Sequence, residues 1–342
     1  MTLYSFREDH ALHASRGHPE RPARLAAVRD AIKADPGLAE LVHVTGPPAR
    51  PDALDRVHER AYLEALETFC ETGGGHLDVD TYATPHSWHV AREACGDLLE
   101  IVDRVCTGDA TNGFALGRPP GHHARPAAAM GFCLLANVAV AARHAQAEHR
   151  LDRVMVIDVD VHHGNGTQEA FYDDPSVFFV SSHQEDIFPG SGGLAEVGAG
   201  RGEGFTLNLP VPGGTGDAAL LGAYRQSVLP LADRFQPQLV LVSAGYDAHR
   251  LDPLGGLALS VSGLADLVRL AMEIADRYAD GRIVLSLEGG YNTDVLAHAV
   301  TSSLRVLVDP SAAASDPFGP SRQSGPDLSA LVRAVRERHG LG

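Results

Sequence analysis

The stretch of residues 153–168, R-V-M-V-I-D-V-D-V-H-H-G-N-G-T-Q, constrains the fold of this chain more than any other. It begins as an apolar, largely β-branched run that is typical of a buried strand, and it ends in Asp158, Asp160, His162 and His163. Buried carboxylates and imidazoles persist only when they are paired, hydrogen-bonded or bound to a metal ion. Because side chains two residues apart share one face of an extended chain, Asp158, Asp160 and His162 are expected to converge. Ordinary hydrogen bonding at a strand end is the simpler alternative, but so dense a polar cluster favours a cation site.

Apolar runs of strand length alternate with helical patterns along most of the chain. We predict strands at 114–116, 153–158, 177–181, 205–209, 238–243 and 282–287. We predict helices at 22–33, 54–71, 87–106, 132–147, 167–172, 217–235, 261–278 and 292–307, with Asp217 as an N-cap. This alternation is typical of an α/β protein with a mainly parallel sheet and helices on both faces.

The C-terminal part of the chain differs in composition. Residues 309–326 are rich in proline, glycine and serine, which indicates a linker, and a short helix is predicted at 328–337. We therefore divide the chain into a main domain, residues 1–308, and a C-terminal segment, residues 309–342.

Composition argues against several classes of protein. The net charge of −16 disfavours a nucleic-acid-binding protein. No segment reaches the ~18 uninterrupted apolar residues of a membrane span. The four cysteines form no C-x-x-C pair, so neither a zinc ribbon nor a disulfide framework is indicated. The N-terminal residues lack the apolar core of a signal peptide, and we predict a cytoplasmic protein.

Polar residues follow five of the predicted strands. Parallel strands bring their carboxyl ends to one edge of the sheet, where ligands of open α/β sheets bind. The residues expected at this edge are His122, His123, Asp160, His162, Asp247 and Tyr291. The two carboxylates and one imidazole of Asp160, His162 and Asp247 would balance a divalent ion. Three protein ligands with one open position are typical of catalytic zinc.

These residue types together indicate metal-assisted hydrolysis of a carbonyl compound. A bound divalent ion would lower the pKa of its water ligand towards ~7. His122 and His123 are placed to exchange protons with that water and with a leaving group. Tyr291 is expected to stay neutral and to donate a hydrogen bond to a developing oxyanion. No P-loop, G-x-S-x-G elbow or G-x-G-x-x-G fingerprint in its proper context points to another chemistry.

Six motifs, in one order over about residues 17–307, resemble those of the zinc-dependent histone deacetylase superfamily. They are R-P-P-G-H-H-A, M-G-F-C, D-V-D-V-H-H-G-N-G-T-Q, F-P-G-S-G, A-G-Y-D with D-P-L-G-G, and E-G-G-Y-N. The superfamily includes bacterial deacetylase-like amidohydrolases and acetylpolyamine amidohydrolases. The resemblance implies the arginase–deacetylase fold, a single α/β domain with a central eight-stranded, mainly parallel sheet flanked by helices. It also implies that residues 1–308 are a deacetylase catalytic domain.

The resemblance assigns roles to individual residues. It implies zinc ligands at Asp160, His162 and Asp247, although two carboxylates and one imidazole can also hold iron(II). His122 would be the general base, with Asp158 behind it and His123 as the second histidine. Tyr291 would polarise the amide carbonyl of the substrate.

The resemblance also implies a substrate tunnel and a second cation. The residues that would line an acyl-lysine tunnel are Gly131, Phe132, Phe188, Leu254 and Gly289. A structural potassium ion would use Asp158, Ser181 and the main-chain carbonyls of Asp160, His162 and Ser182.

Two positions discriminate between subfamilies. Asn165 stands where many class I deacetylases carry an aspartate behind the second histidine, and this is the class II pattern. An amide stabilises a charged imidazolium less than a carboxylate does, so His123 should be less basic. Leu254 stands where polyamine deacetylases carry a glutamate for a secondary ammonium, and leucine instead suits an apolar rim.

We therefore expect an enzyme that removes acetyl or related acyl groups from lysine side chains of proteins or peptides. An acetylpolyamine deacetylase acting on a small acylated amine is the first alternative. A catalytically weak acyl-lysine sensor is the second. Neither a nucleic-acid nor a membrane partner is expected.

Several polar residues have two interpretations. Asp78 and Asp80, in a glycine-rich loop, either contact substrate at the rim or are ordinary surface carboxylates. Arg21 and Arg24, near the start of the first helix, either tie down carboxylates or lie in a surface loop. His163 is expected to point away from the cation and to be structural.

Overall fold

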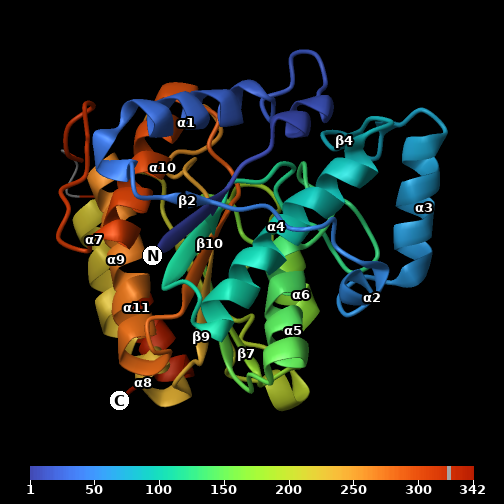
Figure 1. Ribbon diagram of the computed structural model, residues 1–342. Coiled ribbons are helices and arrows are strands. Elements are labelled where there is room, and N and C mark those ends of the chain that lie inside the picture. Colours follow the sequence, from blue (N-terminus) through green and yellow to red (C-terminus); the bar gives the residue numbers. More distant parts are fainter. Residues whose placement is uncertain (322–324) are drawn as a thin grey trace.

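A single eight-stranded sheet runs through the centre of the computed structural model, which describes residues 1–321 and 325–342 (Figure 1). Its strand order is β2-β1-β5-β10-β9-β6-β7-β8, and every neighbouring pair is parallel. The strands are β1 (Thr2–Ser5), β2 (Val42–His43), β5 (Asn112–Ala115), β6 (Val154–Asp158), β7 (Val177–Gln184), β8 (Thr206–Val211), β9 (Leu239–Ala244) and β10 (Ile283–Leu287). A short antiparallel pair, β3 (Gly75–His76) and β4 (Tyr82–Ala83), stands apart from it. The predicted single-domain fold with an eight-stranded parallel sheet is confirmed.

Helices cover both faces of the sheet. They are α1 (Ala23–Ala34), α2 (Pro51–Leu54), α3 (Arg60–Glu71), α4 (Ser87–Thr107), α5 (Asn137–His149), α6 (Asn165–Phe171), α7 (Asp217–Ala223), α8 (Leu229–Phe235), α9 (Val261–Tyr278), α10 (Thr293–Val308) and α11 (Ser329–Arg338). Helices α9, α10 and α11 lie on one side of the sheet and α4 and α5 on the other (Figure 1). None of the helices in the described residues combines the length and hydrophobicity that crossing a lipid bilayer requires.

Alternate side chains of the strands enter two apolar cores. On β6, Met155 and Ile157 pack in the core under α1, α9 and α10. Val154 and Val156 pack in the other core, under α4 and α5. Because both faces of β6 are buried, the strand is hydrophobic without interruption until Asp158, where it leaves the sheet.

Four local predictions were wrong, each because tertiary contacts override the local pattern. Strands β1 and β2 were missed, since segments of only four and two residues carry little periodicity. The predicted helix 54–71 breaks between α2 and α3, where His58 turns inward and accepts a hydrogen bond from the Ala136 amide at 2.9 Å. The helix predicted at 132–147 begins only at Asn137. Asp217 is the first residue of α7 rather than its cap, and its carboxylate accepts hydrogen bonds from Ser260.

The C-terminal segment packs against the main body of the protein. The predicted final helix is confirmed as α11, and Leu328, Val332 and Val335 are buried in the core shared with α9 and α10. Arg250 and Arg269 donate hydrogen bonds to main-chain carbonyls within residues 310–319. Residues 322–324 of the predicted linker lie outside the described residues. The division of the chain at residue 308 stays a prediction.

Burial of α11 leads to a stability prediction. Leu328→Ala is expected to lower the free energy of unfolding by about 2–4 kcal/mol, because it opens a cavity in the core. Arg333→Ala, an exposed position on α11, the helix that Leu328 precedes, should change it by less than about 0.5 kcal/mol. Urea denaturation followed by circular dichroism measures both, and equal values for the two variants would mean that α11 does not stabilise the fold.

Candidate active site

Three metal-ligating side chains meet at the carboxyl edge of the sheet. Asp160 and His162 follow β6, and Asp247 follows β9, which pairs with β6. One ligand atom from each lies within 4.8 Å of the others. His162 Nδ1 lies 3.1 Å from Asp160 Oδ1 and 3.4 Å from Asp247 Oδ2. Asp247 Oδ2 is buried and has no hydrogen-bond partner in the described part of the chain. A buried carboxylate oxygen left open is costly, so this donor set fits a divalent cation.

The pKa values of these ligands reflect close, buried charges. Burial, together with the nearby Asp160 carboxylate, raises the pKa of Asp247 to about 7. Burial opposes ionisation of Asp160, but His122 and His162 hold its pKa well below the usual range. Burial disfavours the charged form of His162, yet the two carboxylates raise its pKa to about 10. The three side chains therefore interact strongly with one another, as close buried charges do.

Glycines allow the carboxylates to approach the backbone. A Cβ atom at Gly289 would lie 1.9 Å from Asp247 Oδ2, and one at Gly245 would lie 2.1 Å from Asp160 Oδ2. The Gly289 amide donates a hydrogen bond to Asp160 Oδ2 at 2.9 Å. Gly289, predicted in the tunnel wall, thus lies behind the carboxylates and is not among the residues that line the cavity described below.

Two adjacent histidines lie beside the three ligands. His122 Nδ1 lies 2.9 Å from Asp158 Oδ2, and His123 Nδ1 lies 2.7 Å from Asn165 Oδ1. Their ring centroids are 3.9 Å apart. Burial disfavours charge on both rings, but Asp158 and Asp160 raise the pKa of His122 well above its usual value. Burial and the neighbouring His122 lower the pKa of His123 well below that value. The two imidazoles therefore differ strongly in basicity.

A cavity of about 280 Å³ adjoins these residues. Its lining residues are Asp80, His123, Gly131, Phe132, His162, Ile187, Phe188, Leu254 and Tyr291. Phe188 lies edge-on to His123 with ring centroids 5.0 Å apart, and Phe132 lies edge-on to Tyr291 at 5.8 Å. Gly131 has φ +54°, and a Cβ there would lie 2.4 Å from His123 Cδ2. All predicted tunnel residues except Gly289 are thus brought together, and Ile187 is an addition.

The two rim aspartates have different surroundings. Asp78 Oδ1 accepts hydrogen bonds from the amides of Asp80 and Thr81, so it closes its own turn. Asp80 lines the cavity. The rim prediction therefore retains Asp80, whereas Asp78 orders the loop.

The residues predicted for potassium lie close together in the sheet. Asp158 and Ser181 are directly paired on β6 and β7. The Ser181 hydroxyl lies 2.9 Å from His183 Nδ1, and the Ser182 hydroxyl lies 2.8 Å from the Tyr224 hydroxyl. Ser182 therefore has its side chain engaged elsewhere, which leaves its main-chain carbonyl as the group relevant to the prediction.

His163 is held outside the ligand cluster. Its Nδ1 lies 2.8 Å from Ser191 Oγ and its Nε2 lies 3.0 Å from Gln168 Oε1. Both ring nitrogens are thus engaged, in keeping with a structural position.

Two buried carboxylates that support the site were not predicted. Glu288 accepts hydrogen bonds from the amides of Gly121 and His122, at 2.6 Å and 3.1 Å. Asp252 accepts one from the Tyr291 amide at 2.6 Å. Both belong to motifs quoted above, E-G-G-Y-N and D-P-L-G-G, but nothing local in the sequence indicates that they bind backbone amides.

Arg24 connects helix α1 to the loop that carries Tyr291. It donates hydrogen bonds to the main-chain carbonyls of Glu288 and Gly290, and its guanidinium carbon lies 5.0 Å from the centroid of the Tyr291 ring. Buried Glu20 pairs with both Arg24 and Arg118. Arg21 is exposed, so of the two arginines only Arg24 contributes to the site.

The Glu20 pairing generates a prediction about acid stability. Burial disfavours the charged Glu20 carboxylate, but Arg118 lowers its pKa to about 2. A depressed folded-state pKa stabilises the fold above the unfolded pKa of about 4.3, and this stabilisation is lost as pH falls towards 2. Between about pH 6 and pH 3, the unfolding free energy of the wild type should fall by about 2 kcal/mol more than that of Glu20→Gln.

Urea denaturation of both proteins at the two pH values measures this difference. Acid-sensitive groups distant from Glu20 contribute equally to both proteins, so their contributions cancel in the comparison. Parallel losses in the two proteins would contradict the role of Glu20.

Comparison with known proteins agrees with the motifs. Residues 18–307 match the family described as the histone deacetylase domain. Histone deacetylase 14, chloroplastic, of Arabidopsis thaliana is 41% identical over 321 residues, which cover 89% of this chain and 76% of the relative. The histone deacetylase-like amidohydrolase of Pseudomonas aeruginosa is 38% identical over 306 residues, 89% and 80% of the two chains. The crystal structure of the HDA15 HD domain aligns with TM-score 0.88 and 34% identity, covering 98% of this chain and 95% of that one.

Proposed function

The chain belongs to the histone deacetylase family and is a deacetylase, a hydrolase of amide C–N bonds, and we propose that its substrates are acylated lysine side chains of proteins or peptides. The lining of the cavity described above is the observation that supports this proposal. Two phenylalanines, Phe132 and Phe188, line it, and both His162 and Tyr291 reach it. A cavity lined in this way suits a linear aliphatic chain whose amide lies next to His162 and Tyr291.

We propose that Asp160, His162 and Asp247 hold a zinc ion, for which iron(II) is the alternative. The open oxygen of buried Asp247 supports this assignment. When bound, the ion supplies a Lewis acid that lowers the pKa of a water ligand. A structural potassium ion between Asp158 and Ser181 is proposed on their direct pairing in the sheet.

The remaining residues are proposed to bind the amide and to move protons. His122, oriented through Nδ1 by Asp158, accepts a proton from the attacking water at Nε2. Burial raises the pKa of Tyr291 well above its usual value, so its phenol remains a hydrogen-bond donor to the carbonyl oxygen. As the C–O bond forms and the C–N bond breaks, the histidine pair returns a proton to the leaving amine.

Asp80 is the observation that favours the alternative, an acetylpolyamine substrate. Its carboxylate lines the cavity and could bind an ammonium group. Leu254 lines the same cavity and is 37% exposed, which favours an apolar contact instead. We therefore retain acyl-lysine as the substrate.

The proposed location of the protein is the cytoplasm. The four cysteines are free in the structure, which suits a reducing compartment. One relative, named above as chloroplastic, indicates that members of this family also occur elsewhere.

Substitution of the proposed hydrogen-bond donor tests the mechanism. Tyr291→Phe is expected to lower kcat on an acetyl-lysine peptide by about 10²–10³-fold, since it removes one oxyanion donor. Binding of the peptide, measured by fluorescence anisotropy, should change little. Tyr278→Phe, a surface tyrosine bonded to Asp233, is the matched control. An unchanged kcat in Tyr291→Phe would exclude this role.

Substitution of Leu254, which lines the cavity, tests which substrate the enzyme prefers. The wild type should have a higher kcat/KM on acetyl-lysine peptides than on acetylspermidine. Leu254→Glu should raise kcat/KM on acetylspermidine by about three- to tenfold through one new charge pair, whereas Leu254→Gln should not. Equal or higher activity of the wild type on acetylspermidine would favour the alternative substrate.

A further inference from the structure

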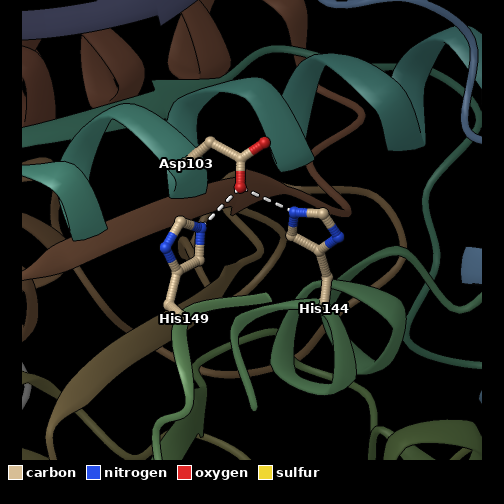
Figure 2. A group of neighbouring side chains, drawn as sticks. All are labelled: Asp103, His144 and His149. Carbon is tan, nitrogen blue, oxygen red and sulfur yellow. Dashed lines mark hydrogen bonds and ion pairs between the residues drawn. The ribbon is translucent and has the colours of Figure 1, made fainter. Parts of the chain in front are cut away.

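A second cluster of metal-ligating side chains lies away from the active site. Asp103 is on α4, His144 is on α5, and His149 is the last residue of α5 (Figure 2). Helix α4 leads into β5 and α5 leads into β6, so both helices end near the amino ends of those strands. The candidate active site lies at the carboxyl ends. The two clusters therefore occupy opposite edges of the sheet.

The three side chains point at one another. Asp103 Oδ1 lies 2.7 Å from His144 Nε2 and 2.6 Å from His149 Nε2 (Figure 2). One ligand atom from each residue lies within 4.8 Å of the others. The imidazoles are 13% and 17% exposed and the carboxylate 42%, so the two rings are held in place while the third ligand is open to solvent.

Charge at this cluster is not balanced by basic side chains. The neighbouring arginines pair with other carboxylates, Arg56 with Glu148 and Arg104 with Glu100. Among residues 1–321 and 325–342, the salt bridges of Asp103 involve only the two histidines. An added cation would therefore meet a carboxylate that no arginine or lysine pairs with in these residues.

We propose that Asp103, His144 and His149 form a second metal site, one that takes a divalent transition ion such as zinc. Two imidazoles and one carboxylate suit such an ion, whereas magnesium and calcium prefer oxygen ligands. In the tautomer with its hydrogen on Nδ1, each imidazole offers the Nε2 lone pair to the ion. A pocket of about 660 Å³ adjoins the three residues and leaves room for water as a further ligand.

Such an ion would cross-link the last turn of α5 to α4 through its ligands. Helix α5 ends at His149, and the next residue, Arg150, has a left-handed backbone with φ +56°. The ion would bind only to the folded protein, because its ligands come from two helices. Zinc is therefore expected to raise the thermal unfolding midpoint.

Zinc stoichiometry tests the proposal. The purified protein is dialysed against micromolar zinc chloride, and bound zinc is measured by mass spectrometry. The wild type should hold about one zinc per chain more than the double variant His144→Gln/His149→Gln. Glutamine can still donate a hydrogen bond to Asp103 but is a poor zinc ligand, so the substitution separates metal binding from hydrogen bonding. Asp103→Asn is a second route to the same loss if the double variant does not fold.

Two controls separate this site from the active site. Asp247→Asn should lose one zinc and retain the other, whereas His89→Gln, an exposed histidine on α4, should lose none. Added zinc should raise the unfolding midpoint of Asp247→Asn but give no such rise when the two histidine substitutions are combined with it. Equal zinc content in the wild type and the double variant would overturn the proposal. The test depends only on the difference in zinc content between the wild type and the double variant. It is therefore valid whether or not zinc occupies the active site.

Discussion

Burial of several carboxylates at one edge of the sheet is the constraint on which the rest of this structure depends. Asp158, Asp160, Asp247 and Glu288 are all essentially inaccessible to solvent. Ionised carboxylates in such a place are unstable unless each finds compensation. Asp158 pairs with His122 and with the Asp160 amide, and Glu288 binds two backbone amides. Asp247 binds the Val161 amide through one oxygen and leaves the other open, which is why a cation at this point would stabilise the whole edge.

The loops that follow β9 and β10 bring main-chain atoms close to these buried carboxylates. Gly245 and Gly289 pack directly on the carboxylates of Asp160 and Asp247, where any Cβ would collide. Arg24 holds the second of these loops in place. It donates hydrogen bonds to two carbonyls of that loop, and its guanidinium group lies over the Tyr291 ring. Helix α1 and Asp252 thus help to position Tyr291, in addition to strand β10, which precedes its loop. Its position depends on residues far apart in the chain.

Local pattern was sufficient for most of the fold and for part of the site. Strands buried on both faces, such as β6, appear as continuous apolar runs, and the polar residues at their carboxyl ends meet because parallel strands share one edge. Turns are less predictable. The M-G-F-C segment looks helical, but Phe132 has φ +69° and the helix begins five residues later. Glu288 and Asp252 could not be inferred, because a carboxylate that binds distant amides leaves no periodic signal. The cluster of Asp103 with His144 and His149 was missed for the same reason, since its members are 41 and 46 residues apart.

The adjacent histidines illustrate how small differences behind a site control its chemistry. His122 and His123 share the same burial, and their Nδ1 atoms each face one oxygen. The oxygen belongs to a carboxylate for His122 and to an amide for His123. A full negative charge stabilises an imidazolium far more than an amide dipole does, so a proton gained by the pair is expected on His122. Once His122 is charged, its field further disfavours charge on His123, 3.9 Å away between ring centroids. A single positive charge in the pair, held on the histidine backed by Asp158, is therefore the state that follows the proposed transfer of the water proton to His122.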